Sequence, residues 1–375
     1  MSVSKIGSTM AALGLVALCA SAHAAPPVVA TSFEADAGGW VVLNPATGQP
    51  DGTDKIAVVH DAAQLKEGKG SLKYTYAIRK GSTNILILPI AQIASGPMSS
   101  FHFWIKPDHS TSFMFAVGAK GGGRYQSVFT AKAGAWQEVS ISLSDLVPGD
   151  DQKGGPKTPA ADQIENIGIV DTNSYLIQLF GGQNAPVDFS EGEHSLLLSP
   201  FMAQGTDLAP IPKPAAGTQH LISVFRPQVD WMVIGGPAVE KATGAPLTAA
   251  GIKATYKQEK ARIIALMKGI PADSLTGTKS IKLSAASKNA SSIIVQLEEA
   301  GGGKYKATLD IEGGSKLKDY KIDIAEFSQA DDSKDSNNKL DLDQVVRVII
   351  VDYTGLAGGA EAENTLWLGD LQTIK

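Results

Sequence analysis

The sequence predicts an all-β protein built from two tandem antiparallel β-sandwich domains. Two observations carry this prediction: short apolar segments recur between turn residues along the chain, and one half of the chain repeats in the other. The composition agrees, since 39 glycines and 19 prolines among 375 residues favour many strands joined by turns. With 43% apolar and 19% charged residues, the chain can also bury a real core.

The internal repeat is the stronger of the two observations. GGGRY at 121–125 recurs as GGGKY at 301–305, 180 positions later. After one inserted residue the offset becomes 181, and DQIENIGIVD at 162–171 falls on DQVVRVIIVD at 343–352 without a gap. A match that keeps register over about fifty residues indicates two copies of one module.

Residues 1–24 have the pattern of a cleaved signal peptide. Lys5 is the only charged residue, an apolar run follows, and Ala22-His23-Ala24 gives a small-x-small pattern before the cut. The sequence therefore predicts an exported protein, periplasmic or extracellular. Cleavage would remove Cys19, the single cysteine, so we expect no disulfide in the mature chain. No other apolar segment is long enough to span a membrane.

The rest of the chain divides into a first module at 25–204, a proline-rich linker at 205–217 and a second module at 218–375. Alternating prolines in the linker (Pro210, Pro212, Pro214) favour an extended spacer. A loop packed on one module is the alternative.

Within each module we expect short strands with turn residues between them and no amphipathic helix. In the first module the expected strands are 72–80, 84–89, 101–106, 113–117, 125–130, 136–143, 167–170, 176–180 and 195–198. In the second they are 261–267, 279–284, 292–297, 319–324, 345–351 and 364–371.

The order of these segments resembles a known family. Phe33-Glu34 before a glycine-tryptophan turn, then GSLKY, FHFWIKPD, AWQEVSISLSDL and IENIGIVD, is similar to the galactose-binding-like jelly roll. Within that group it is most similar to the non-catalytic carbohydrate-binding modules of family eleven and their relatives. The resemblance covers most of 28–203 and extends through the repeat to roughly 220–374. It implies a jelly roll whose concave sheet face binds a glycan through aromatic and polar side chains.

The resemblance also implies a structural calcium ion, held by an early acidic residue and an acid on the last strand. Glu34 matches the early acid in the first copy, and Asp370 matches the late acid in the second. Each module thus has half of the pattern. We expect no other cofactor. The mature histidines lie far apart and show no zinc-site spacing; they are His60, His102, His109, His194 and His220.

Trp104 is the most informative candidate for ligand binding. Phe103 and Ile105 alternate with it and point to the core, so Trp104 should share the outer face with His102 and Lys106. We align Lys282 with Trp104 in the second copy, so the fold does not need tryptophan there. An outward indole can stack on a sugar ring. The alternative is that a loop or the other module covers it.

Arg124 and Gln126 are the other candidates. They alternate with Tyr125 and are expected on the face of Trp104, where they would suit hydroxyls or a carboxylated sugar. A solvated sheet face is the alternative. Trp136 aligns with Leu317, and Trp367 with the region of Leu197, so we expect both tryptophans in the core.

Charge and motifs exclude other function classes. The net charge is −5, and neither module has a surplus of basic residues, which argues against nucleic acid as a partner. No nucleophile elbow, HExxH or P-loop motif is present, so we expect no enzyme. Paired carboxylates, as in a glycosidase, remain open among 38 acidic residues.

The leading hypothesis is an exported, non-catalytic protein that binds a polysaccharide or oligosaccharide on the outer sheet face of the first module. The alternative is an envelope or scaffold protein whose β-sandwich modules bind another protein. A hydrolase or lyase ranks third.

Overall fold

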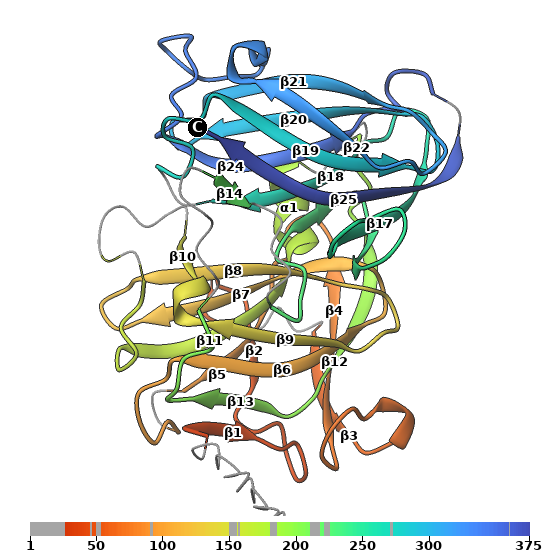
Figure 1. The fold of residues 1–375 in the computed structure, drawn as a ribbon. Helices are drawn as coiled ribbons and strands as arrows, with labels where there is room; N and C mark the ends of the chain where they lie inside the picture. The colour runs from red at the N-terminus through yellow and green to blue at the C-terminus, as the bar shows by residue number, and fades with distance from the viewer. Residues whose placement is uncertain are drawn as a thin grey trace, which may run out of the picture.

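The computed structural model describes residues 27–45, 47–49, 54–90, 93–149, 156, 158–180, 186–210, 218–220, 226–270, 273–359 and 361–375. The predicted signal peptide and residues 211–217 of the predicted linker lie outside these ranges. The fold is all-β as predicted, with four antiparallel sheets, two before residue 205 and two after residue 217. Figure 1 shows the two modules one above the other, with the first module below.

The first module is a sandwich of two sheets. We name the larger one the β6 sheet; its order is β1-β13-β6-β12-β4-β3, with β9 also paired to β6. Its strands are β1 (Val29–Thr31), β3 (Lys55–Val59), β4 (Ser71–Ile78), β6 (Ser100–Pro107), β9 (Gln137–Ser142), β12 (Gly192–Leu198) and β13 (Phe201–Gln204). The facing β8 sheet has the order β10-β8-β7-β11-β5-β2. Its strands are β2 (Val41–Leu43), β5 (Ile85–Pro89), β7 (Thr111–Ala119), β8 (Arg124–Ala131), β10 (Val147–Pro148) and β11 (Ile164–Asp171).

The second module repeats this architecture. The β19 sheet has the order β16-β17-β25-β19-β22, with β14 also paired to β25. Its strands are β14 (Thr218–His220), β16 (Ala238–Ala242), β17 (Gly251–Gln258), β19 (Ser280–Ser287), β22 (Lys318–Asp323) and β25 (Ala362–Ile374). The facing β20 sheet has the order β15-β18-β24-β20-β21-β23. Its strands are β15 (Met232–Ile234), β18 (Ile264–Gly269), β20 (Ser291–Glu299), β21 (Lys304–Ile311), β23 (Ser328–Gln329) and β24 (Val345–Asp352).

Each sandwich has its own hydrophobic core, and the two cores differ in chemistry. Phenylalanine rings from both sheets meet in the first core, as in the 5.0 Å approach of Phe101 to Phe115. The second core is mainly aliphatic, with Trp231 fully buried at its edge. Burial of these side chains provides most of the stabilisation, because each large one contributes about 1.5–3 kcal/mol.

The two triple-glycine motifs form the predicted hairpin turns between β7 and β8 and between β20 and β21. Gly122 has φ of 93° and Gly302 has φ of 90°, a region that favours glycine. The corresponding tyrosines, Tyr125 and Tyr305, are both buried beside these turns. The recurrence of one turn at one place in both sandwiches confirms the repeat in structure.

One predicted strand is wrong. Residues 176–180 belong to a helix, α1 (Thr172–Phe180), instead of a strand. The Asp171 carboxylate accepts the Asn173 backbone N–H at the start of this helix, at 2.9 Å. Leu176 and Ile177 are buried while Tyr175 is exposed, so the apolar residues occupy one helical face. The described residues also form three 3-10 helices: η1 (Ala62–Gln64), η2 (Leu143–Asp145) and η3 (Ile324–Glu326).

The chain segment at 226–234 joins the modules, because it contacts strands of both sheets of the first sandwich. Val229 O accepts the backbone N–H of Thr130 on β8, at 2.9 Å. The Gln228 side chain bonds both backbone groups of Ser140 on β9, at 3.1 and 2.8 Å. The second module therefore covers edge strands of both sheets of the first.

The described part of the predicted linker also contacts the first module. Thr206 O accepts a hydrogen bond from Ser100 Oγ at 2.7 Å, and Ala209 O accepts one from Arg226 at 2.9 Å. These contacts agree with the packed-loop alternative over residues 206–209.

In the described ranges, no helix combines the length and the apolar character needed to cross a membrane.

Candidate functional site

The outer face of the β6 sheet displays the side chains that alternation places there. Phe101, Phe103 and Ile105 are at most 1% exposed, whereas Trp104 and His102 are half-buried on the opposite face. Lys106 is half-buried on that outer face as well. The structure thus brings Trp104, His102 and Lys106 together, as predicted from the sequence.

Strand β9 adds polar groups beside these residues. Glu138 pairs with Trp104 across the strands, and Ser140 pairs with His102. His102 Nε2 lies 3.2 Å from Glu138 Oε1, and the imidazole stands edge-on to the indole with ring centroids 6.5 Å apart. The indole therefore has hydrogen-bonding groups on two sides.

A loop touches the Trp104 ring, in agreement with one alternative drawn from the sequence. Lys66 Nζ lies 4.1 Å from the ring centroid, and the indole Nε1 donates a hydrogen bond to Glu67 Oε1 at 2.9 Å. Lys66 and Glu67 are both exposed. A cation–π contact at an exposed site contributes only about 0.5–1 kcal/mol, so a ligand can displace the lysine at small cost.

Trp136 is a second tryptophan on this face, and the prediction that it belongs to the core is wrong. It is half-buried immediately before β9, two residues from Glu138, with Lys106 Nζ 6.0 Å from its ring centroid. Diagonal neighbours across two strands lie about 7–8 Å apart. Trp104 and Trp136 therefore flank Lys106 on one surface. Trp367 on β25 is also half-buried, so its core prediction is wrong too.

Arg124 and Gln126 do not share this surface. Both lie on β8, in the opposite sheet of the sandwich, where Gln126 pairs with Val147 of β10. Alternation shows which residues of a strand share a face, but it does not show which sheet the strand joins. The prediction of a common face with Trp104 is therefore wrong.

The second module has no aromatic residue at the position of Trp104. β6 and β19 begin at Ser100 and Ser280 and run in step, so Ser284 corresponds to Trp104. The predicted match to Lys282 is wrong, because Lys282 corresponds to His102. Lys282 and Ser284 both contact Asp319, at 2.8 and 2.5 Å. The fold is thus complete without an aromatic residue at this place.

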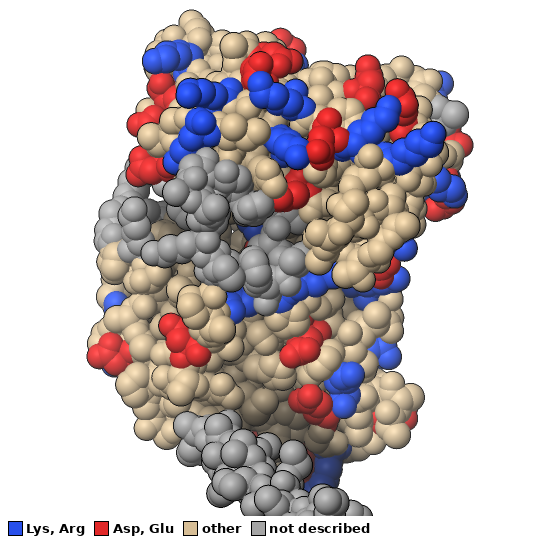
Figure 2. All heavy atoms as spheres, in the orientation of Figure 1, with Lys and Arg blue, Asp and Glu red and all other residues tan. Residues whose placement is uncertain are grey.

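A hollow of about 390 Å³ lies farther along the β6 sheet, where β4 and β12 pair. Arg79, Glu191 and Glu193 are its charged lining residues, and Tyr76 forms part of its wall. These side chains give the hollow both hydrogen-bond donors and hydrogen-bond acceptors. Figure 2 shows that Lys, Arg, Asp and Glu are interspersed over the second module, whereas broader areas without charge cover the first.

Calcium at Glu34 or Asp370 stays a prediction, and each of the two carboxylates has a protein partner. Calcium takes six to eight oxygen ligands. The Lys69 ammonium lies 3.4 Å from the Glu34 carboxylate, and Asp370 accepts a hydrogen bond from Gln372 at 2.6 Å. Among the described residues, no group of three or more acidic or histidine side chains forms around either one. The two acids also lie in different modules.

No family model and no curated protein matches this chain. Solved structures do match. The family 11 carbohydrate-binding module of a cellulosomal cellulase from Clostridium thermocellum is 14% identical, with a TM-score of 0.34, over 43% of this chain and 96% of that one. The N-terminal tandem of two family 22 modules from Paenibacillus barcinonensis Xyn10C is 14% identical, with a TM-score of 0.31, over 94% of this chain and 98% of that one.

A third structure is the xylan-binding first family 22 domain of the same Paenibacillus protein. It is 14% identical, with a TM-score of 0.31, over 50% of this chain and 98% of that one. The structural neighbours are thus carbohydrate-binding modules of the class that the sequence resembles. At these identities and scores the likeness says nothing about a ligand.

Proposed function

We propose that this chain is an exported, non-catalytic carbohydrate-binding protein that holds a glycan on the outer face of its β6 sheet. The observation behind this proposal is the half-buried Trp104, accompanied by Trp136, on the outer face of a sheet whose counterpart in the second module has serine in place of Trp104. A partly exposed tryptophan at a position where the fold does not need one is well suited to stacking on a ligand.

The neighbouring groups suit a sugar. The apolar face of a pyranose would stack on the Trp104 indole after Lys66 moves aside. His102, Glu138 and Lys106 would then donate and accept hydrogen bonds at the equatorial hydroxyls around the ring. These polar side chains are half-buried and already oriented by β6 and β9, which reduces the entropy lost on binding.

The test is affinity electrophoresis of residues 25–375 against a panel of soluble polysaccharides. We expect one glycan to retard the protein and Trp104→Ala to remove the retardation, since a buried aromatic anchor contributes about 2 kcal/mol or more. Trp367→Ala is the matched control, because it removes a half-buried tryptophan from the second module. Its retardation should stay unchanged.

Two results would contradict the proposal in different ways. Equal retardation of the Trp104→Ala protein would overturn the assigned face while leaving glycan binding intact. Absence of retardation by every glycan, with the protein folded, would favour the scaffold alternative. The next experiment would then be crosslinking in the native envelope to find a protein partner.

A further inference from the structure

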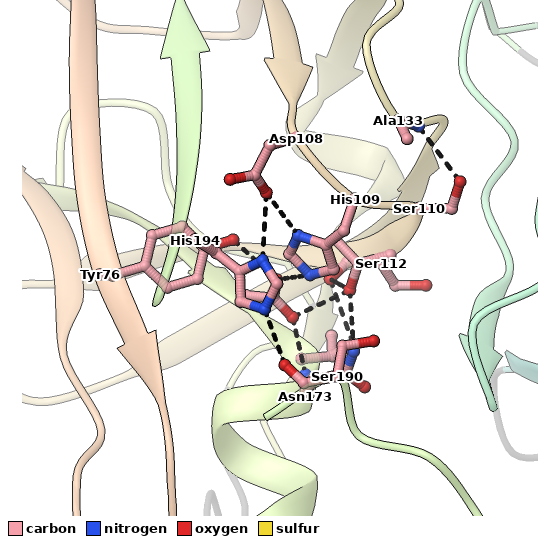
Figure 3. A network of polar contacts seen from close by, with 12 residues as sticks. Tyr76, Asp108, His109, Ser110, Ser112, Ala133, Asn173, Ser190 and His194 are labelled. Atoms are coloured by element: carbon pink, nitrogen blue, oxygen red, sulfur yellow. Dashed lines mark hydrogen bonds and ion pairs between the residues drawn. The ribbon is translucent and has the colours of Figure 1, made fainter. Parts of the chain in front are cut away.

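One end of the first sandwich gathers residues that lie far apart in the sequence. Asp108 and His109 follow β6, His194 lies on β12, and Asp171 ends β11. Figure 3 shows both imidazole rings turned toward the Asp108 carboxylate. His109 Nδ1 and His194 Nδ1 lie 2.9 and 3.2 Å from the same atom, Asp108 Oδ1. One possible ligand atom from each of Asp108, His109 and His194 lies within 4.8 Å of the other two.

The opposite nitrogen of each ring also faces an oxygen acceptor. His194 Nε2 lies 2.7 Å from Ser190 O, and His109 Nε2 approaches Asp171 Oδ2 to 3.0 Å as an ion pair, off the axis of an ideal hydrogen bond. A neutral imidazole that keeps its one N–H at Nε2 has a lone pair on Nδ1. In that tautomer both Nδ1 lone pairs would face Asp108 Oδ1, an arrangement that suits a cation bound between them.

We propose that Asp108, His109 and His194 form a binding site for a divalent transition-metal ion, zinc first. Two imidazole nitrogens and one carboxylate oxygen are ligands that zinc prefers, and calcium or magnesium would favour oxygen alone. Three protein ligands leave a fourth position open. The rings are 13% and 16% exposed and Asp108 is 42% exposed, so the ion has a path from solvent.

The surrounding contacts support the ligands as they do in known metal centres. Histidine ligands usually donate their second N–H to a carboxylate or a backbone carbonyl. Here Asp171 supplies the carboxylate for His109, and Ser190 supplies the backbone carbonyl for His194. Asp171 is itself held by Tyr76 OH at 2.8 Å and Thr111 Oγ1 at 2.9 Å. Ser195 N donates to Asp108 Oδ2 at 2.6 Å, which leaves Oδ1 turned toward the rings.

The second module shows that the fold does not need these ligands. Asp352 and Tyr256 repeat Asp171 and Tyr76, with the same hydroxyl-to-carboxylate hydrogen bond, at 2.5 Å. By the shared strand limits and pairing, Lys288, Asn289 and Asn364 replace Asp108, His109 and His194. Gln258 and Asn364 satisfy the polar groups there through neutral amides. The histidine pair is therefore an addition to the first module.

The two imidazole rings also lie close to each other, with centroids 3.9 Å apart. One divalent ion bound to both Nδ1 atoms would use this closeness, whereas two separately charged rings at this distance would repel each other.

The test uses the untagged chain 25–375, stripped with EDTA and titrated calorimetrically with zinc chloride. We expect about one equivalent of zinc, and a His109→Asn/His194→Asn variant, which copies Asn289 and Asn364, should lose at least about tenfold in affinity. His60→Asn, at an exposed site elsewhere, is the control. Cobalt chloride should give visible absorption bands in the wild type and none in the double variant.

Two outcomes would overturn the proposal. One is a folded wild type that binds no zinc, which would leave the cluster as a protonated ion-pair network. The other is equal zinc affinity in the double variant, which would place the metal elsewhere. Near-ultraviolet circular dichroism verifies that each variant is folded. Neither result depends on glycan binding, because Trp104 and its neighbours are unchanged.

Discussion

Adjacent residues of β6 have opposite roles. Phe103 is fully buried among the rings of Phe115, Phe129 and Phe201, while Trp104 lies half-buried on the outer face. This difference follows directly from the two-residue period of a strand, and the sequence was sufficient to predict it.

The pair gives a test at the scale of single residues. We expect Phe103→Ala to lower the free energy of unfolding by about 3–5 kcal/mol, because it leaves a cavity in a packed core. Trp104→Ala should lower it by under about 1 kcal/mol, since surface changes cost little. Urea denaturation measures both. Equal losses in the two variants would mean that Trp104 is a structural residue and not a free binding surface.

Residues distant in sequence could not be placed together in this way. Alternation assigned Arg124 and Gln126 to one face of their strand, but it could not show which sheet the strand joins. The pairing of β8 with β7 places both residues in the β8 sheet. The alignment of Trp136 with Leu317 was correct in register, but an apolar counterpart does not imply burial. His109 and His194 meet only through the pairing of β12 with β4 and β6. Comparing them with Asn289 and Asn364 in the repeat was the available clue.

Elements were predicted best where a long alternating pattern was present. Strands β4, β6 and β7 were found for this reason, and so were β19 and β20 in the second module. The counterpart of β4, β17 (Gly251–Gln258), was not predicted. The run at 176–180 is too short for periodicity to separate a strand from a buried helix segment. The turn that replaces α1 in the second module, around Gly355, shows that this part of the repeat diverged.

Edge strands are the elements that most need protection, and the 226–229 segment provides it. Arg226 forms two hydrogen bonds to the carboxylate of Asp145 in η2, which follows β9, at 2.8 and 3.0 Å. The two side chains are only 9% and 13% exposed. The segment lies in the predicted second module, and nothing in its composition indicated that it completes the first.

A substitution of Arg226 tests whether the 226–229 segment holds the edge of the first sandwich. Arg226→Ala leaves Asp145 buried without its charged partner, and we expect a loss of about 3–5 kcal/mol in the free energy of unfolding. Lys257→Ala breaks the exposed pair with Glu259, where both side chains are about half exposed, and should cost under about 1 kcal/mol. Similar small losses in both variants would show that the 226–229 segment does not hold the edge of the first sandwich.

At the scale of the whole molecule, β15 belongs to both cores. Trp231 and Val233 point into the second core, whereas Met232 between them is buried against the first. Val233 N also donates a hydrogen bond to Ser112 Oγ of the first module at 2.6 Å. A single alternating segment thus packs one face on each sandwich, and the two modules should behave as one cooperative unit.

This arrangement predicts one coupled thermal transition for the whole chain. Met232→Glu would bury a charge between the modules at a cost of several kcal/mol, so we expect the calorimetric trace to separate into two transitions. Leu356→Glu is the matched control, because this leucine is 53% exposed on the second module. Its trace should keep a single transition. If Met232→Glu also unfolds in one transition at an unchanged temperature, the modules are coupled elsewhere or are independent, and the two-faced role of β15 is wrong.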